Sequence, residues 1–422
     1  MTSEVSKVER TEPTSRSTVT ALLTQRQTAN QAYFAHEADR LARLCHLTAQ
    51  RFARGGRLLA LGGTPAARSD ARHVAVEFVH PVIVGKRALP ALALTSEGGE
   101  LALQLELVAR ADDIVIAFGT DEDGGEAARA VARARDRGCL TIAFSGCPAE
   151  YVLEPPTGDP YVRQELVETL YHVLWELVHV FFEHRGLLVG RDARATHDAG
   201  ASSFLYPFLA EREEPLEPVL DDVRRSVLIK AQEIGELRVQ TLEENAPALT
   251  AAAEALRGCF ESDGTLLALG NGGSATDAMD AVADFRSDRD GRRPRPALDL
   301  TEDTSVLTAI ANDIGPEAMF SRQVIAYARP GDALLAFSTS GNSRSIIDAL
   351  VEARRQKLIT IAMVGYDGGQ VAAQQLADHV VITRSQHIPR IQEAQATAYH
   401  VLRAMVESVG SVEPPVEPVA PG

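Results

Sequence analysis

An apolar run that ends in a glycine-rich turn constrains this chain more than any other feature. Residues 266–269 (Leu-Leu-Ala-Leu) are typical of a buried strand, and residues 275–280 favour a helix. The turn between them consists of Gly270, Asn271, Gly272, Gly273 and Ser274. Glycine lets the backbone approach a ligand closely, and N–H groups at a helix start attract anions. The stretch therefore predicts a phosphate-type loop, and the alternative is a tight strand-to-helix turn without a ligand.

A second loop of the same kind follows the apolar run 333–337. It contains four hydroxyl side chains and an amide, and a helical pattern begins at Ile346: Ser338, Thr339, Ser340, Asn342 and Ser343. Such a donor cluster can hold a phosphate without a lysine. A hydroxyl-capped turn is the alternative, but two such loops in one segment favour an anion site.

Strand and helix patterns alternate along the chain, which predicts parallel, doubly wound sheets. Buried-strand patterns occur at 57–61, 91–94, 114–118 and 140–144, with a weaker one at 82–84. A long amphipathic helix is expected over 164–184, and two helical runs are expected after Val219.

The two halves of the chain repeat each other. Gly63 and Asp70 correspond to Gly270 and Asp277, each 207 residues later, and the flanking apolar runs match. We therefore predict an α/β protein with two doubly wound parallel-sheet domains and flanking helices, related by internal duplication. The expected domains are 17–185 and 217–411, with a linker at 186–216 and disordered ends at 1–16 and 412–422.

The first half has lost the features of an anion site. Its first loop carries Pro65, which lacks an N–H, and Ala67, which lacks a hydroxyl. Its second loop, 119–124, carries three carboxylates that would repel a phosphate at close range. Phosphate binding is thus expected in the second half only, and replacing Thr120 in the first half should not affect it.

Composition excludes several classes of protein. The formal net charge of −16 argues against nucleic acid and anionic membranes as partners. The four cysteines are widely spaced, which indicates reduced thiols and a cytoplasmic location. No apolar run reaches membrane-spanning length.

The two loops of the second half, together with residues 390–393 (Arg-Ile-Gln-Glu) and His400, resemble the sugar isomerase (SIS) domain. The resemblance runs from about Val227 to Ser408 and is nearest to the phosphoheptose (sedoheptulose 7-phosphate) isomerases and their initiator-associating relative. It implies that the loop residues and Gln392 bind a sugar phosphate. It also implies that Asn312 and Asp313 contact sugar hydroxyls, for which an Asx-turn is the alternative.

The same family has a zinc quartet: a His and a Glu four residues apart, and a Gln and a His eight residues apart. The first half has all four types, and the second half departs at two positions: His73, Glu77, Gln164 and His172, against Asp280, Asp284, Gln392 and His400. The first set implies a zinc site and the second a possible further set. Ordinary helix histidines and a solvated acidic face are the alternatives.

The resemblance implies an aldose–ketose isomerase acting on a sugar phosphate such as sedoheptulose 7-phosphate, with Asp284 and His400 as catalytic residues. Asp284 is one methylene shorter than the glutamate of the family, which weakens the case for catalysis. A phosphosugar-sensing or scaffold protein and a metal-linked accessory protein are the alternatives. The expected assembly is a dimer of tandem chains, with the long helices 164–184 and 392–405 supplying its apolar interface.

Overall fold

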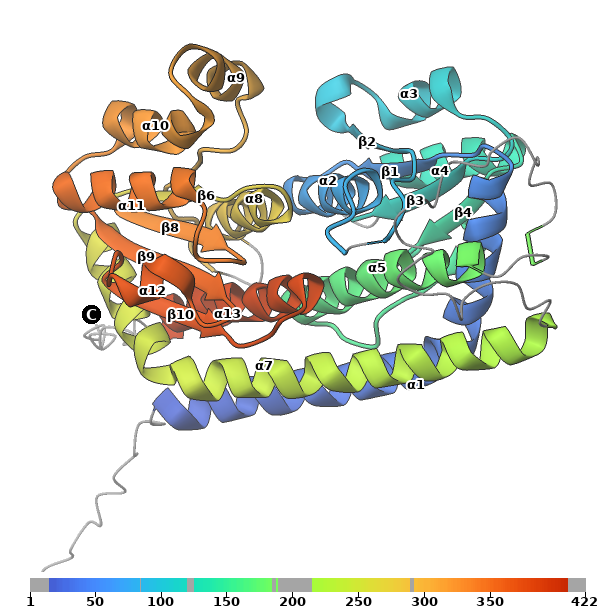
Figure 1. Cartoon of the computed structure of the whole chain (residues 1–422), viewed down its shortest axis with the longest axis horizontal. Coiled ribbons are helices and arrows are strands. Elements are labelled where there is room, and N and C mark those ends of the chain that lie inside the picture. Colours follow the sequence, from blue (N-terminus) through green and yellow to red (C-terminus); the bar gives the residue numbers. More distant parts are fainter. Residues whose placement is uncertain are drawn as a thin grey trace, which may run out of the picture.

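The computed structural model describes residues 15–83, 85–119, 125–183, 187–188, 215–288 and 292–408. Two α/β halves lie side by side, each built on a five-stranded parallel sheet (Figure 1). The predicted fold class is confirmed. Residues 15 and 16, predicted to be disordered, begin a helix. The rest of the predicted disordered ends and most of the linker fall outside the described residues, and so does Thr120.

The first half has the strand order β2-β1-β3-β4-β5. Helices follow β1, β2, β3 and β5, while β4 leads to β5 without a helix between them, so strands and helices mostly alternate along the chain as expected for a doubly wound sheet. They are β1 (Leu58–Gly62), α2 (Pro65–Val79), β2 (Ala91–Thr95), η1 (Ser96–Gly98), α3 (Leu101–Val108), β3 (Ile114–Phe118), α4 (Glu126–Asp136), β4 (Leu140–Ala143), β5 (Tyr151–Val152) and α5 (Pro160–Glu183).

The second half has the same order, β7-β6-β8-β9-β10, as the internal repeat predicts. Its elements are β6 (Leu266–Leu269), α8 (Gly273–Arg286), β7 (Ala297–Asp299), α9 (Thr304–Asp313), η4 (Pro316–Ala318), α10 (Met319–Tyr327), β8 (Ala333–Ser338), α11 (Arg344–Arg355), β9 (Ile359–Gly365), α12 (Gly369–Ala373), β10 (His379–Thr383) and α13 (Ile388–Ser408).

Each sheet is covered on both faces, which is why its central strands are mostly apolar and almost completely buried. Side chains of a strand alternate between the two faces. Leu58 and Ala60 of β1 therefore enter one core, and Leu59 and Leu61 enter another. Strand β6 divides its four residues between two cores in the same way.

Helices from both halves meet at the centre of the molecule. Helices α2 and α8 lie side by side, α5 and α13 lie below them, and α1 (Ser15–Ala53) runs along α7 (Leu216–Glu261) at the lower edge (Figure 1). The apolar faces of α5 and α13 are therefore buried within one chain. The predicted use of these helices as an interface between chains is wrong.

Some predicted elements differ from the observed ones. The two helical runs after Val219 form the single helix α7, which contains Pro247. Val82 and Ile83 lie in irregular chain, and Val84 is outside the described residues. The second half also has α9, η4 and α10 between β7 and β8, where the first half has only η1 and α3 between β2 and β3.

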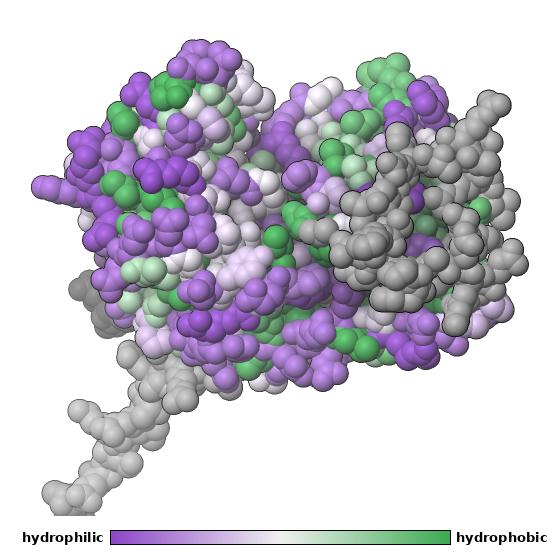
Figure 2. Space-filling model, in the orientation of Figure 1, coloured by the Kyte–Doolittle hydropathy of each residue, from purple (hydrophilic) through white to green (hydrophobic). Residues whose placement is uncertain are grey.

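The face shown in Figure 2 is largely hydrophilic along its lower edge, where α1 and α7 lie. Green, hydrophobic residues occur in small groups, one of them over α3, whose Leu103 and Leu107 are exposed. Among the described helices, none combines the length and the apolar character needed to span a membrane.

Candidate functional site

Both loops predicted from the sequence lie at the topological switch point of the second sheet. Strands β6 and β8 are neighbours in the sheet. After β6 the chain crosses to β7 on one side, and after β8 it crosses to β9 on the other, so the two following loops separate in opposite directions. Ligands of open α/β sheets bind at this point, outside the carboxyl ends of the strands. The turn 270–273 and the loop 339–343 flank it.

The helices that start at these loops have no side-chain cap. Gly272, with φ +59°, precedes α8, and Ser343 precedes α11, and neither makes a capping hydrogen bond through its side chain. In α8 the N–H groups of Ser274 and Ala275 donate to the preceding turn (3.1 and 3.0 Å). The N–H groups of Gly273, Arg344 and Ser345 have no acceptor among the described residues and are available to an anion. Ser274 is buried in the first turn of α8, while Thr339, Ser340 and Ser343 are half-buried.

Some loop residues maintain the loop itself. The Ser338 hydroxyl accepts from the Gly341 N–H (3.1 Å), and the Asn271 amide donates to the Ser345 hydroxyl (3.0 Å). The Asn342 side chain accepts from the N–H of Gln370 (3.0 Å), which joins the loop to α12. The donors of the second loop are thus held in place by their neighbours.

The matching turn in the first half is closed. The Thr64 hydroxyl caps α2 by accepting from the Ala67 N–H (3.3 Å). A Cβ added at Gly119, in the second loop, would lie 2.7 Å from the Ala67 Cβ and 3.0 Å from the Thr64 hydroxyl oxygen. Gly119 therefore lies directly against the first turn of α2.

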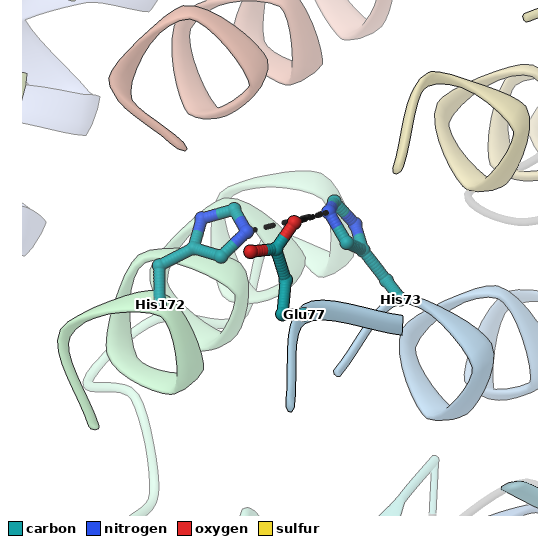
Figure 3. Close-up of side chains that lie close together, drawn as sticks. All are labelled: His73, Glu77 and His172. Atoms are coloured by element: carbon teal, nitrogen blue, oxygen red, sulfur yellow. Dashed lines mark hydrogen bonds and ion pairs between the residues drawn. The ribbon is translucent and has the colours of Figure 1, made fainter. Parts of the chain in front are cut away.

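A buried cluster of metal-ligand type lies next to the second-half loops. His73 and Glu77 project from α2 and His172 from α5, and the three side chains point toward one another (Figure 3). Their ligand atoms all lie within 4.8 Å of one another. The two Nε2 atoms are 3.3 Å apart, and Glu77 Oε1 is 4.0 Å from His73 Nε2.

The fourth member of this cluster comes from the other half of the chain. Gln392 of α13 places its Nε2 atom 3.2 Å from His73 Nε2. Gln164, which the sequence assigned to this set, is half-buried at the start of α5 and forms no hydrogen bond with the cluster among the described residues. Gln392 therefore belongs with His73, Glu77 and His172, and not with the second set.

The donor set fits a zinc ion. Two imidazole nitrogens, a carboxylate and an amide oxygen are ligands that zinc accepts. Glu77 Oε2 and Gln392 Oε1 are buried and have no hydrogen-bond partner among the described residues. Turning the Gln392 amide by half a rotation would bring its oxygen to His73. Burial and the neighbouring His172 lower the pKa of His73, which keeps the imidazole neutral, as a metal ligand must be.

Groups around the cluster hold the imidazole rings. The Tyr171 hydroxyl is 3.0 Å from His73 Nδ1, and Glu393 Oε1 is 2.9 Å from His172 Nδ1. Both Nε2 atoms consequently face the centre of the cluster. Burial also raises the pKa of Glu77, since it disfavours a charged carboxylate. The sequence analysis missed Tyr171 and Glu393, although residues 390–393 carried part of the family resemblance.

The cluster and the anion loop touch at Gly273. A Cβ added there would lie 2.1 Å from Gln392 Nε2 and 3.0 Å from His73 Nε2. The first helical turn of α8 thus lies against the cluster. The glycine-rich turn of the second half therefore contacts the His73, Glu77 and His172 cluster of the first half through Gln392 and His73.

The corresponding cluster of the second half has a different chemistry. His400 Nε2 is 3.1 Å from Asp284 Oδ2 and 3.7 Å from Asp280 Oδ2, and its Nδ1 is 2.9 Å from Glu165 Oε1. Burial lowers the pKa of His400, but hydrogen bonds to the three carboxylates outweigh it and raise that pKa well above its usual value. A protonated His400 then neutralises part of the acidic charge.

The structure also shows where the other predicted site residues lie. Asp284 and His400, expected to be catalytic, lie in this second cluster, while the loop at Gly273 adjoins His73 and Gln392. Ligand atoms of Asp280, Asp284 and His400 also lie within 4.8 Å of one another. Asn312 and Asp313 are exposed at the end of α9 and hydrogen-bond to each other (2.8 Å), and neither bonds to the loops among the described residues.

Comparisons with known proteins identify the family of this chain. The SIS domain matches residues 231–365. The chain is 43% identical over 203 residues to a phosphoheptose isomerase of Chlorobium phaeobacteroides, covering 47% of this chain and 85% of the relative. It is 42% identical over 193 residues to that of Roseiflexus sp., covering 45% and 91%.

A solved structure matches the fold of both halves. Tagatose-6-phosphate ketose/aldose isomerase from Escherichia coli covers 96% of each chain with a TM-score of 0.54, at 14% identity, which shows the fold alone. Two doubly wound sheets with an anion loop and a buried ligand cluster define a phosphosugar isomerase-like SIS protein. The chain belongs to the phosphoheptose isomerase family of SIS-domain proteins, whose members it matches over about half of its length.

Proposed function

We propose that this protein is an aldose–ketose isomerase of sugar phosphates, with one complete site per chain formed from both halves. The contact of Gly273 with Gln392 and His73 carries the proposal, because it joins the phosphate loop of one half to the ligand cluster of the other. Sedoheptulose 7-phosphate is the substrate we propose, by likeness to the phosphoheptose isomerases.

The second-half loops would bind the phosphate. The uncapped N–H groups at the starts of α8 and α11 and the hydroxyls of Ser274 and Ser340 supply donors without a positively charged side chain. Binding at this end directs the carbonyl end of the sugar toward α2 and α5. The α2 side chains then lie at the reacting carbons.

Glu77 would carry the proton between the two adjacent carbons. Its Oε2 atom has no hydrogen-bond partner among the described residues. A carboxylate there can take a proton from one carbon and return it to the next through an enediol. His73, Glu77, His172 and Gln392 would hold a zinc ion, which would stabilise negative charge on the substrate oxygen.

Turnover of sedoheptulose 7-phosphate by the purified protein, with zinc and with a chelator, tests the proposal. We expect isomerisation that requires zinc. Binding of the sugar phosphate without turnover would contradict an isomerase and favour the phosphosugar-sensing alternative. Absence of both binding and turnover would contradict the whole assignment.

A further inference from the structure

Glu393 is the buried charge that connects the two halves at the proposed site. It lies on α13, in the second half, and its Oε1 atom is 2.9 Å from Nδ1 of His172 in the first half. Both side chains are fully buried. Resting on the proposed function, we propose that Glu393 is a positioning residue that holds the proton of His172 on Nδ1 and so leaves the Nε2 lone pair for the metal.

Neighbouring charges keep Glu393 ionised and fixed. Arg390 donates to its Oε1 atom (2.7 Å), and Arg390 also donates to Glu176 of α5 (2.8 Å). The Thr169 hydroxyl donates to the other oxygen at 3.4 Å. An ionised carboxylate can only accept hydrogen bonds, so the His172 nitrogen that faces it must be the one that carries hydrogen.

The other nitrogen of His172 has a different environment. Nε2 lies 3.3 Å from His73 Nε2, at the centre of the ligand cluster. With the ring proton on Nδ1, the neutral imidazole directs its lone pair to this point. Carboxylates that hold ligating histidines in this way raise ligand basicity, and their loss commonly lowers metal affinity 10- to 100-fold.

A matched pair joins α5 to α13 in the opposite sense, with its carboxylate in the first half and its histidine in the second. Glu165 Oε1 is 2.9 Å from His400 Nδ1, and Glu165 is bonded to Arg26 as Glu393 is to Arg390. Glu165 is as deeply buried as Glu393. His400 Nε2, however, faces the acceptors Asp280 and Asp284. The same Glu–His contact therefore leaves a lone pair for a metal on His172 but not on His400.

Glu393→Gln tests this inference, with Glu165→Gln as the control. Glutamine keeps the size of the side chain but can donate to Nδ1, which allows the His172 proton to move to Nε2. We expect zinc affinity, measured by competition with a chelating dye, to fall about 10- to 100-fold in Glu393→Gln. Glu165→Gln should change the zinc affinity by no more than about twofold, since His400, the partner of Glu165, lies outside the proposed zinc site.

Nitrogen-15 NMR of the metal-free protein measures the tautomer directly and needs no variant. We expect His172 to carry its proton on Nδ1 in the wild type and on Nε2 in Glu393→Gln. A wild-type proton on Nε2, unchanged zinc affinity in Glu393→Gln, or equal losses in both variants would overturn the inference. If the wild type binds no zinc, the metal part of the proposed function fails, while the NMR result still decides the role of Glu393 in setting the tautomer.

Discussion

At the scale of single residues, Gly273 joins the anion loop to the ligand cluster. Any Cβ at this position would displace Gln392 and press on His73. We expect Gly273→Ala to lower zinc affinity at least about tenfold, as loss of a ligand contact commonly does. Gly258→Ala is the control, because a Cβ there meets no atom within 4 Å. Dye competition measures both, and equal affinities would contradict the arrangement.

Residue types were predictable from the sequence, but their partners were not. His73, Glu77 and His172 have the spacing of the family pattern, and the structure brings them together. The spacing of residues along a helix predicts which side of that helix they occupy. It does not predict whether the neighbouring helix belongs to the same half of the chain or to the other half. Gln392 and Gln164 are equivalent in sequence, so only the packing of α13 against the first half distinguishes them.

At the scale of elements, strands with unbroken apolar runs were predictable because both faces of each sheet are buried. Strands β5, β7 and β10 were not predicted: β5 and β7 are two and three residues long, and all three lie at sheet edges and are only partly buried. A short, half-exposed strand has little apolar signal, and its pairing depends on the neighbouring strand. The single helix α7 was missed because Pro247 indicates a helix boundary.

A further prediction concerns Ser340, in the loop after β8. We expect Ser340→Ala to weaken sugar-phosphate binding by about 1.5–3 kcal/mol, the usual effect of losing a hydrogen bond to a charged group. Thr64→Ala, in the closed turn of the first half, should lower stability by about 1 kcal/mol through loss of a helix cap and leave binding unchanged. Calorimetry that finds equal binding losses would argue against a phosphate site in the second half alone.

At the scale of the whole molecule, buried ion pairs join the halves and make stability depend on pH. Burial raises the pKa of Glu176, but Arg390 and Lys230 outweigh it and lower that pKa to about 2, below the ordinary 4.5. Because the pKa is lower in the folded protein than in the unfolded chain, the ionised carboxylate stabilises the fold at pH values above about 4.5. This stabilisation is lost as the pH falls from about 4.5 toward 2. The shift corresponds to about 3 kcal/mol.

Glu176→Gln should therefore lower the melting temperature at pH 7 and flatten its decline between about pH 4.5 and 2, the window between the ordinary and the folded-state pKa of this carboxylate. Glu106→Gln removes an exposed pair with Arg133 and should change neither. Parallel melting curves for wild type and Glu176→Gln across this range would show that the inter-half pair does not stabilise the fold.

A dimer of chains stays a prediction that rests on the family. The apolar faces of α5 and α13 are buried inside the chain, so another surface would have to form the interface. Light scattering at micromolar concentration should give about twice the chain mass of 45.4 kDa. The mass of a single chain would contradict it.

The central question is whether Glu77 or Asp284 transfers the proton of a substrate bound at the second-half loops. Turnover of sedoheptulose 7-phosphate by folded Glu77→Gln and Asp284→Asn, assayed side by side with zinc, decides this most directly. We expect Glu77→Gln to lose at least about 100-fold in kcat, as for loss of a general base, while Asp284→Asn keeps most of its activity. Loss of activity in Asp284→Asn with activity retained in Glu77→Gln would contradict a site shared between the halves.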